Sequence, residues 1–145
     1  MLFKEILEWQ QAARPEPTEQ DKAISIGIHL EEVSEYLFNL AATTGEASVH
    51  IRTVANEVHS LAEKIKTGQY TPIIISRIDH ADALGDQIVT AIGDLHIQGI
   101  DALGVVGEIS RSNGSKFVDG KPVFNENGKV IKGPDYTKPS LAEFV

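Results

Sequence analysis

The chain has 145 residues, of which 41% are hydrophobic and 23% are charged, and its formal net charge is −8. This length and apolar content predict a single domain spanning residues 1–145. Because the chain has no cysteine, disulfide scaffolds, thiolate zinc sites and cysteine nucleophiles are excluded. No apolar run approaches the roughly 18 residues that a membrane span needs, so we expect a soluble, cytoplasmic protein with no membrane partner.

The negative charge argues against a nucleic-acid polymer as a partner, because that binding depends on clustered Lys and Arg. The charge is uneven along the chain. Residues 1–112 hold 8 basic and 17 acidic side chains, a net charge of −9, whereas residues 113–145 hold 5 and 4, a net charge of +1. An anionic ligand would therefore need either the C-terminal residues or a bound cation.

The hydrophobic spacing predicts two helices in the first third of the chain. A short one covers residues 2–13 and stops before two prolines. The second opens at Thr18, with Asp21 three residues later as its capping partner. Its apolar stripe continues to Leu40, and Thr43-Thr44-Gly45 ends it.

Three further helices are predicted by the same spacing. One covers residues 46–66, and the next covers residues 76–98 and is closed by Gly99. Asp101 is a suitable N-cap for a short fifth helix, which ends near residues 113–114.

Beyond that point the helical period is lost, and Gly and Pro recur. Val123-Phe124 and Val130-Ile131 flank Asn127-Gly128, which is typical of a hairpin turn. The fold class predicted is therefore all-α: an antiparallel bundle of four to five helices. Residues 113–145 form an irregular, structured tail of the same domain that can contain a short hairpin.

Several acids fall on apolar helix faces when the sequence is placed on helical wheels of about 100° per residue. On the second helix, Glu31 and Glu35 share a second apolar face, opposite the main stripe. On the fourth helix, one sector holds Asp79, Asp82 and Asp86 and is continued by apolar residues.

Acids in such places need a neutralising partner, because like charges one turn apart repel and burial of a charge is costly. Carboxylates without cysteine suit Mg²⁺, with Mn²⁺ as an alternative. Two competing interpretations exist. Acids and apolar residues can simply mix at helix edges, and a di-iron bundle would need a Glu-x-x-His motif, which this sequence lacks.

The run Glu31-Glu32-Val-Ser-Glu35 resembles the EExxE signature of the all-α NTP pyrophosphohydrolases, a superfamily that includes MazG-like enzymes, dimeric dUTPases and phosphoribosyl-ATP pyrophosphohydrolases. After one intervening helix, Asp82-Ala-Leu-Gly-Asp86 resembles the second acidic element of that superfamily, ExxD. Here Ala83 stands where the family has its first acid.

The end of the fifth helix extends this resemblance. Ser110-Arg-Ser-Asn113-Gly-Ser115-Lys116, followed by the segments around Lys121 and Lys132, is similar to the SNxSK-and-tail pattern of the phosphoribosyl-ATP pyrophosphohydrolase-like branch. The resemblance covers about residues 20–140.

The resemblance implies a Mg²⁺-dependent nucleoside triphosphate pyrophosphohydrolase that releases pyrophosphate and a nucleoside monophosphate. The implied metal ligands are Glu31, Glu32, Glu35, Asp82 and Asp86. Glu32 or Glu35 would accept a proton from the attacking water. The implied phosphate contacts are Asn113, Ser115 and Lys116, with Lys121 and Lys132 as further candidates.

The second and fourth predicted helices are each apolar on more than one face, which predicts a homodimer or homotetramer. Two alternative functions stay open. The substrate can be that of a phosphoribosyl-ATP pyrophosphohydrolase or a dUTPase-like enzyme, and the departure at Ala83 is compatible with a nucleotide-binding helical module that has no turnover.

Overall fold

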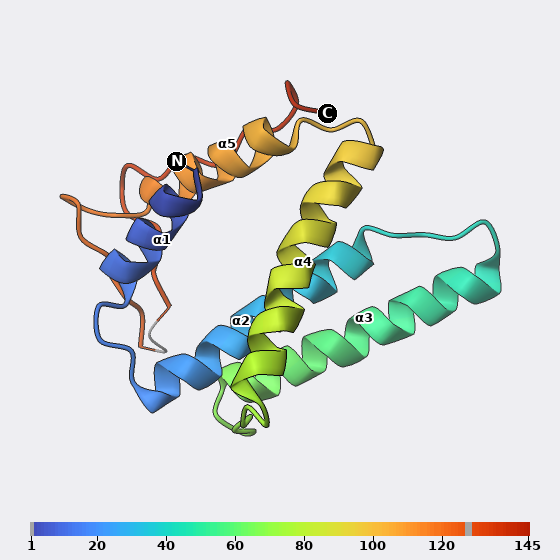
Figure 1. Cartoon of the computed structure of the whole chain (residues 1–145), viewed down its shortest axis with the longest axis horizontal. Coiled ribbons are helices and arrows are strands. Elements are labelled where there is room, and N and C mark those ends of the chain that lie inside the picture. Colours follow the sequence, from blue (N-terminus) through green and yellow to red (C-terminus); the bar gives the residue numbers. More distant parts are fainter. Residues whose placement is uncertain (1, 127–128) are drawn as a thin grey trace. The chain divides into compact units, whose positions relative to one another are not determined.

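The computed structural model describes residues 2–126 and 129–145. Within these residues the protein is all-helical, with five α-helices and no β-strand (Figure 1). The helices are α1 (Leu2–Ala13), α2 (Glu19–Phe38), α3 (Gly45–Lys66), α4 (Arg77–Ile97) and α5 (Ala102–Gly114). The predicted all-α class is confirmed.

The chain divides into two compact units, each with its own internal packing. The first unit combines Met1–Pro15 with Ile74–Val145 and so holds α1, α4, α5 and the tail. The second unit is Glu16–Ile73 and holds α2 and α3.

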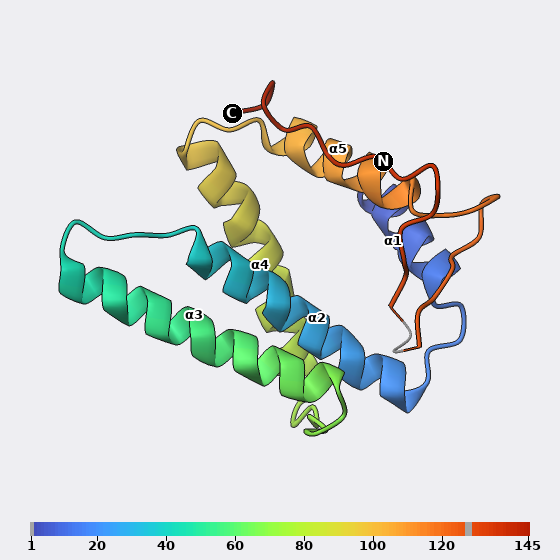
Figure 2. The same ribbon diagram turned by 180° about the vertical axis from the view of Figure 1, so that it is seen from behind.

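In the second unit, α2 and α3 lie side by side and run in opposite directions (Figures 1 and 2). The buried residues along their contact are mostly small: Ile24, Gly27 and Ser34 on α2, and Ala55, Ala62 and Ile65 on α3. The hydroxyl of the fully buried Ser34 donates to the carbonyl oxygen of Glu31 at 2.7 Å, so its burial leaves no unmet hydrogen bond.

At Gly27 the two helices of this hairpin approach each other closely. A Cβ atom on Gly27 would lie 2.7 Å from Cγ of Lys66 and 3.1 Å from the carbonyl oxygen of Ala62. A glycine is therefore required for this packing distance, and Lys66 covers it with its aliphatic stem.

The helix boundaries follow the local sequence signals. Thr18 and Asp21 form a full capping box at the start of α2, and Asp101 caps α5 through the N–H of Gly104 at 3.1 Å. Gly99 has a positive φ of 77° and terminates α4. The second helix ends at Phe38, before the predicted end at residues 43–45, because the N–H groups of Asn39 and Leu40 bond to carbonyl oxygens three residues back instead of four.

In the first unit, α1 packs against the end of α5. Trp9 of α1 donates its indole N–H to the carbonyl oxygen of Asn113 at 3.0 Å and stacks on Phe117, with the ring centroids 5.5 Å apart. Ala13 and Val105 are buried in this unit. By contrast, no residue of α4 is buried.

The predicted hairpin in the tail is present only as single bridges. Phe124 pairs with Val130, and the N–H of Ile131 donates to the carbonyl oxygen of Val123 at 2.8 Å. The predicted turn at 127–128 lies outside the described residues.

No individual helix among residues 2–126 and 129–145 combines the length and the apolar character that crossing a membrane requires. The pair α4 and α5, bent by 119° at their junction, meets the criterion only when the two helices are taken together.

Candidate functional site

The three predicted acids of α2 have different surroundings. Glu31 points toward α3, where its carboxylate lies 2.8 Å from the ammonium of Lys66, and both side chains are largely buried, with exposed fractions of 18% and 17%. Glu32 and Glu35 are exposed. The neutralising partner that the acidic face was expected to need is thus supplied, for Glu31, by a lysine of the same unit.

Lys66 holds two carboxylates, because Glu63 of the preceding turn also contacts its ammonium at 2.5 Å. Burial disfavours the charged form of this lysine, but the hydrogen bonds and charges of Glu31 and Glu63 outweigh that cost, so the pKa of Lys66 is raised above its ordinary value. Lys66 therefore stays charged at neutral pH and ties α2 to the end of α3.

The predicted acids of α4 lie in the other unit. Asp82 and Asp86 are both exposed, one helical turn apart, and Asp79 precedes them in the first turn. Neither Asp82 nor Asp86 has an ion-pair partner in the part of the chain that the structure describes. The i,i+4 spacing leaves two carboxylates side by side on an open helix face.

The acids of α2 and of α4 belong to different units, and the structure defines the geometry within each unit. Within residues 2–126 and 129–145, no group of three or more His, Asp or Glu side chains is already gathered around a common point. The five predicted metal ligands all offer carboxylate oxygens, which are the donors that Mg²⁺ prefers. Four of the five, all but Glu31, are exposed to solvent.

The predicted phosphate-binding residues at the end of α5 have defined partners. The ammonium of Lys116 donates to the side-chain oxygen of Asn113 at 2.6 Å, so these two side chains form one unit. The Ser115 hydroxyl instead donates to the carbonyl oxygen of Ser112 at 2.7 Å and accepts the N–H of Thr137 at 3.0 Å. Ser115 thus has a structural role in holding the tail.

Lys121 and Lys132 lie further along the tail. Lys121 is exposed, and its backbone exchanges two hydrogen bonds with Val118 in a tight turn. The ammonium of Lys132 lies 4.7 Å from the ring centroid of Tyr136, a cation–π contact. Each of these two lysines is placed by contacts within the tail rather than by α5.

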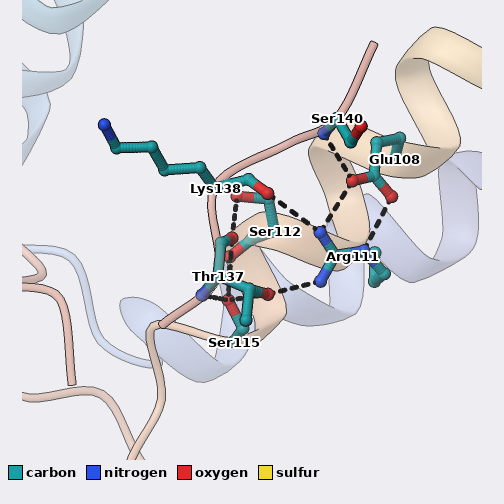
Figure 3. A network of polar contacts seen from close by, with 7 residues as sticks. All are labelled: Glu108, Arg111, Ser112, Ser115, Thr137, Lys138 and Ser140. Atoms are coloured by element: carbon teal, nitrogen blue, oxygen red, sulfur yellow. Dashed lines mark hydrogen bonds and ion pairs between the residues drawn. The ribbon is translucent and has the colours of Figure 1, made fainter. Parts of the chain in front are cut away.

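A dense polar network fastens the tail to α5 (Figure 3). Arg111 makes two hydrogen bonds of 2.7 Å to Glu108, and its remaining donors reach the Thr137 hydroxyl at 2.6 Å and the Lys138 carbonyl oxygen at 3.3 Å. Glu108 also accepts the N–H of Ser140 at 2.8 Å. The hydrogen bonds from Arg111, followed by that from Ser140, lower the pKa of Glu108 to about 2.

Three residues that contact the predicted site residues were not predicted from the sequence: Lys66, which pairs with Glu31, Trp9, which bonds to Asn113, and Thr137, which bonds to Ser115. The spacing of Glu108 and Arg111 at i,i+3 is the only local signal that could have indicated part of the network. The other contacts join residues that are far apart in the chain, such as Ser112 and Thr137, whose hydroxyl and carbonyl oxygen lie 2.9 Å apart.

Comparisons of this chain with protein-family models, with curated proteins and with solved structures found no match.

Proposed function

We propose that this protein is a Mg²⁺-dependent nucleotide pyrophosphohydrolase of the cytoplasm, which cleaves a nucleoside triphosphate or a related nucleotide into a monophosphate and pyrophosphate. The observation that carries the proposal is the pair Asp82 and Asp86, two exposed carboxylates one turn apart on α4. An exposed pair of like charges costs a few tenths of a kcal/mol, and a divalent cation removes that repulsion.

The acids of α2 complete the proposed ligand set. Glu32 and Glu35 are exposed and can bind a cation or accept a proton, whereas Glu31 is engaged by Lys66. Glu31 would therefore act through one carboxylate oxygen or would leave Lys66 on binding. The proposal requires the acids of α2 and α4 to meet at one site, within one chain or across a two-fold contact.

A bound Mg²⁺ would supply charge neutralisation of the phosphate oxygens and a lowered pKa of a water molecule. The chain's own residues have the remaining tasks. Glu35, or else Glu32, accepts the proton of the attacking water. The paired side chains of Asn113 and Lys116 bind a phosphate group, because the ammonium offers charge and the amide offers two further donors.

The direct test is release of pyrophosphate from a panel of nucleotides, measured as inorganic phosphate after inorganic pyrophosphatase is added. The panel includes the common ribonucleoside and deoxyribonucleoside triphosphates, dUTP and phosphoribosyl-ATP, each with Mg²⁺, with Mn²⁺ and with EDTA. We expect turnover that depends on the divalent ion. The same panel separates the alternative substrates, since these differ in the base and sugar and not in the bond that is cleaved.

A module that binds nucleotides without turnover is the second candidate. It is favoured by the Lys66 contact, which already neutralises one predicted metal ligand, and by Ala83 in place of an acid. Metal-dependent binding of a nucleotide by calorimetry, with no product over hours, would support the module and exclude the hydrolase.

We also propose that the protein assembles as a homodimer or homotetramer. Large apolar side chains of α4 are strongly exposed, among them Ile78 at 82%, Val89 at 68% and Ile97 at 81%. Several large apolar side chains exposed along one helix are typical of an interaction face. Light scattering coupled to size-exclusion chromatography tests the assembly, and a monomer at micromolar concentration would contradict it.

A further inference from the structure

The tail runs along α5 in the opposite direction and contacts it at regular intervals. We call residues 133–144 the strap. The N–H of Gly133 donates to the carbonyl oxygen of Lys116 at 3.2 Å, and Thr137 lies against Ser112 and Ser115. Further along, Ser140 contacts Glu108.

The far end of the strap is also fixed. The carbonyl oxygen of Phe144 accepts the N–H of Asp101 at 2.9 Å, at the first turn of α5. The Phe144 ring lies so close to Gly104 that a Cβ atom there would be 2.2 Å from it. The strap therefore spans the whole length of α5, from its N-cap to the residues that follow its last turn.

Arg111 is the centre of this arrangement (Figure 3). It is the one side chain of the network that touches both α5, at Glu108, and two successive strap residues, Thr137 and Lys138. The planar guanidinium offers five donors in a fixed fork, so a single group can hold all three partners in one geometry. Its ion pair with Glu108 also orients that carboxylate toward the N–H of Ser140.

The backbone at Asn113 and Lys116 is contacted both by α1 and by the strap. The carbonyl oxygen of Asn113 is held by the Trp9 indole, and that of Lys116 by Gly133 of the strap. Because a lysine side chain is flexible, fixing its backbone and its amide partner reduces the number of positions that the ammonium can take.

We propose that Arg111 is a positioning residue for phosphate binding: through the strap it fixes the Asn113 and Lys116 pair in the geometry that receives a phosphate group. This inference rests on the proposed function for the identity of the ligand. Four of the five donors of Arg111 are engaged by Glu108, Thr137 and Lys138, so the role proposed for Arg111 is to hold the strap and not to bind the phosphate directly.

The test compares Arg111→Gln with Lys138→Ala in the full chain. Lys138→Ala is the matched control because the network uses only the carbonyl oxygen of Lys138, and its side chain points away (Figure 3). The first readout is amide hydrogen exchange at Thr137 and Ser140, whose N–H groups bond to Ser115 and Glu108. We expect exchange on the order of 10-fold faster in Arg111→Gln and unchanged exchange in Lys138→Ala.

The second readout is the split between KM and kcat for the nucleotide that is turned over. A residue that positions a ground-state phosphate contact changes KM, so Arg111→Gln should raise KM about 10-fold with kcat nearly constant. Arg111→Lys keeps the charge and loses the planar fork of donors, so its KM should lie between those of the unmodified chain and of Arg111→Gln. Faster exchange with unchanged KM would overturn the positioning role, and unchanged exchange would overturn the anchoring role.

Absence of turnover in the unmodified chain would remove the proposed hydrolase and leave this inference testable. Binding of inorganic pyrophosphate is then measured through the fluorescence of Trp9, the only tryptophan of the chain, which contacts Asn113. Weaker binding in Arg111→Gln than in Lys138→Ala would support the inference. Equal binding, or no binding in the unmodified chain, would overturn it.

Discussion

The acidic residues of the α2–α3 hairpin and those of α4 differ in burial and in pairing. In the hairpin, Glu31 lies against the neighbouring helix and its charge is met by Lys66 at 2.8 Å. On α4, Asp82 and Asp86 are exposed on a helix that buries none of its residues. Removing one partner of a largely buried ion pair is destabilising, whereas two exposed acids one turn apart repel each other and are the proposed ligands of a cation. Removing the Lys66 ion pair should therefore affect unfolding, and substitution of Asp86 should affect the proposed activity.

The largest expected effect is that of Asp86→Asn on turnover. The substitution keeps the size of the side chain and removes the charge of a proposed metal ligand. Since a bound metal supplies several kcal/mol of charge stabilisation, turnover should fall about 100-fold or more. Steady-state rates at saturating Mg²⁺ measure this loss, and thermal unfolding should be nearly unchanged.

Asp94→Asn is the matched control for that substitution. Asp94 is also an exposed aspartate of α4, two turns further on, and its carboxylate lies 3.4 Å from the amide of Gln98. Its replacement should leave turnover unchanged. If both variants lost the same activity, the effect would come from the helix as a whole and not from the proposed ligand.

Lys66→Met should give the largest loss of stability among single changes in the hairpin. Methionine keeps the aliphatic stem that covers Gly27 and removes the charge between Glu31 and Glu63. Removing this ion pair from a largely buried carboxylate should lower the free energy of unfolding by about 1–3 kcal/mol, as measured by urea titration.

Lys22→Met is the comparison for Lys66→Met, since Lys22 pairs with Glu19 at the surface, where both side chains are well exposed. Such surface pairs contribute about 0–1 kcal/mol, so the control should unfold almost as the unmodified chain does. Equal losses in the two variants would contradict a special role for Lys66.

Replacing glycine by alanine should change the free energy of unfolding in opposite directions in the α2–α3 hairpin and in α4. At Gly27 the added methyl group meets Lys66 and the Ala62 carbonyl oxygen, so overpacking, partly offset by better helix propensity, should cost about 1–2 kcal/mol. At Gly85 of α4 nothing lies within 4 Å of the new Cβ, and the change should stabilise by about 0.5–1 kcal/mol. Destabilisation by Gly85→Ala would reveal that α4 is covered in the assembled protein.

The smallest expected effect is a loss of stability at low pH that comes from Glu108. Its pKa of about 2 in the folded chain is below the ordinary value of 4.5. Because the folded pKa is lowered, the stabilisation is complete above pH 4.5 and is lost as the pH falls toward about 2. Thermal unfolding between about pH 5 and about pH 2.5 should show a smaller decrease of Tm in Glu108→Gln than in the unmodified chain, and equal decreases would contradict the role of Glu108.

Much of the fold could be predicted from the sequence, because its signals are local. The capping box of Thr18 and Asp21, the N-cap at Asp101 and the stop at Gly99 each involve residues within a few positions of one another. The spacing of apolar residues likewise needs no knowledge of the partner helix. For these reasons the five helices follow the sequence within a residue or two at most ends.

The sequence also identified the acids of α2 and α4 and the residues at the end of α5 as distinctive, although it could not assign their partners. That Lys66 neutralises Glu31, and that Ser115 holds Thr137, depends on how distant segments align. Such contacts are set by the alignment of whole helices and of the strap, in which many weak side-chain contacts act together. The sequence by itself determined where the helices begin and end, and only the tertiary structure decided which charges and hydroxyls meet.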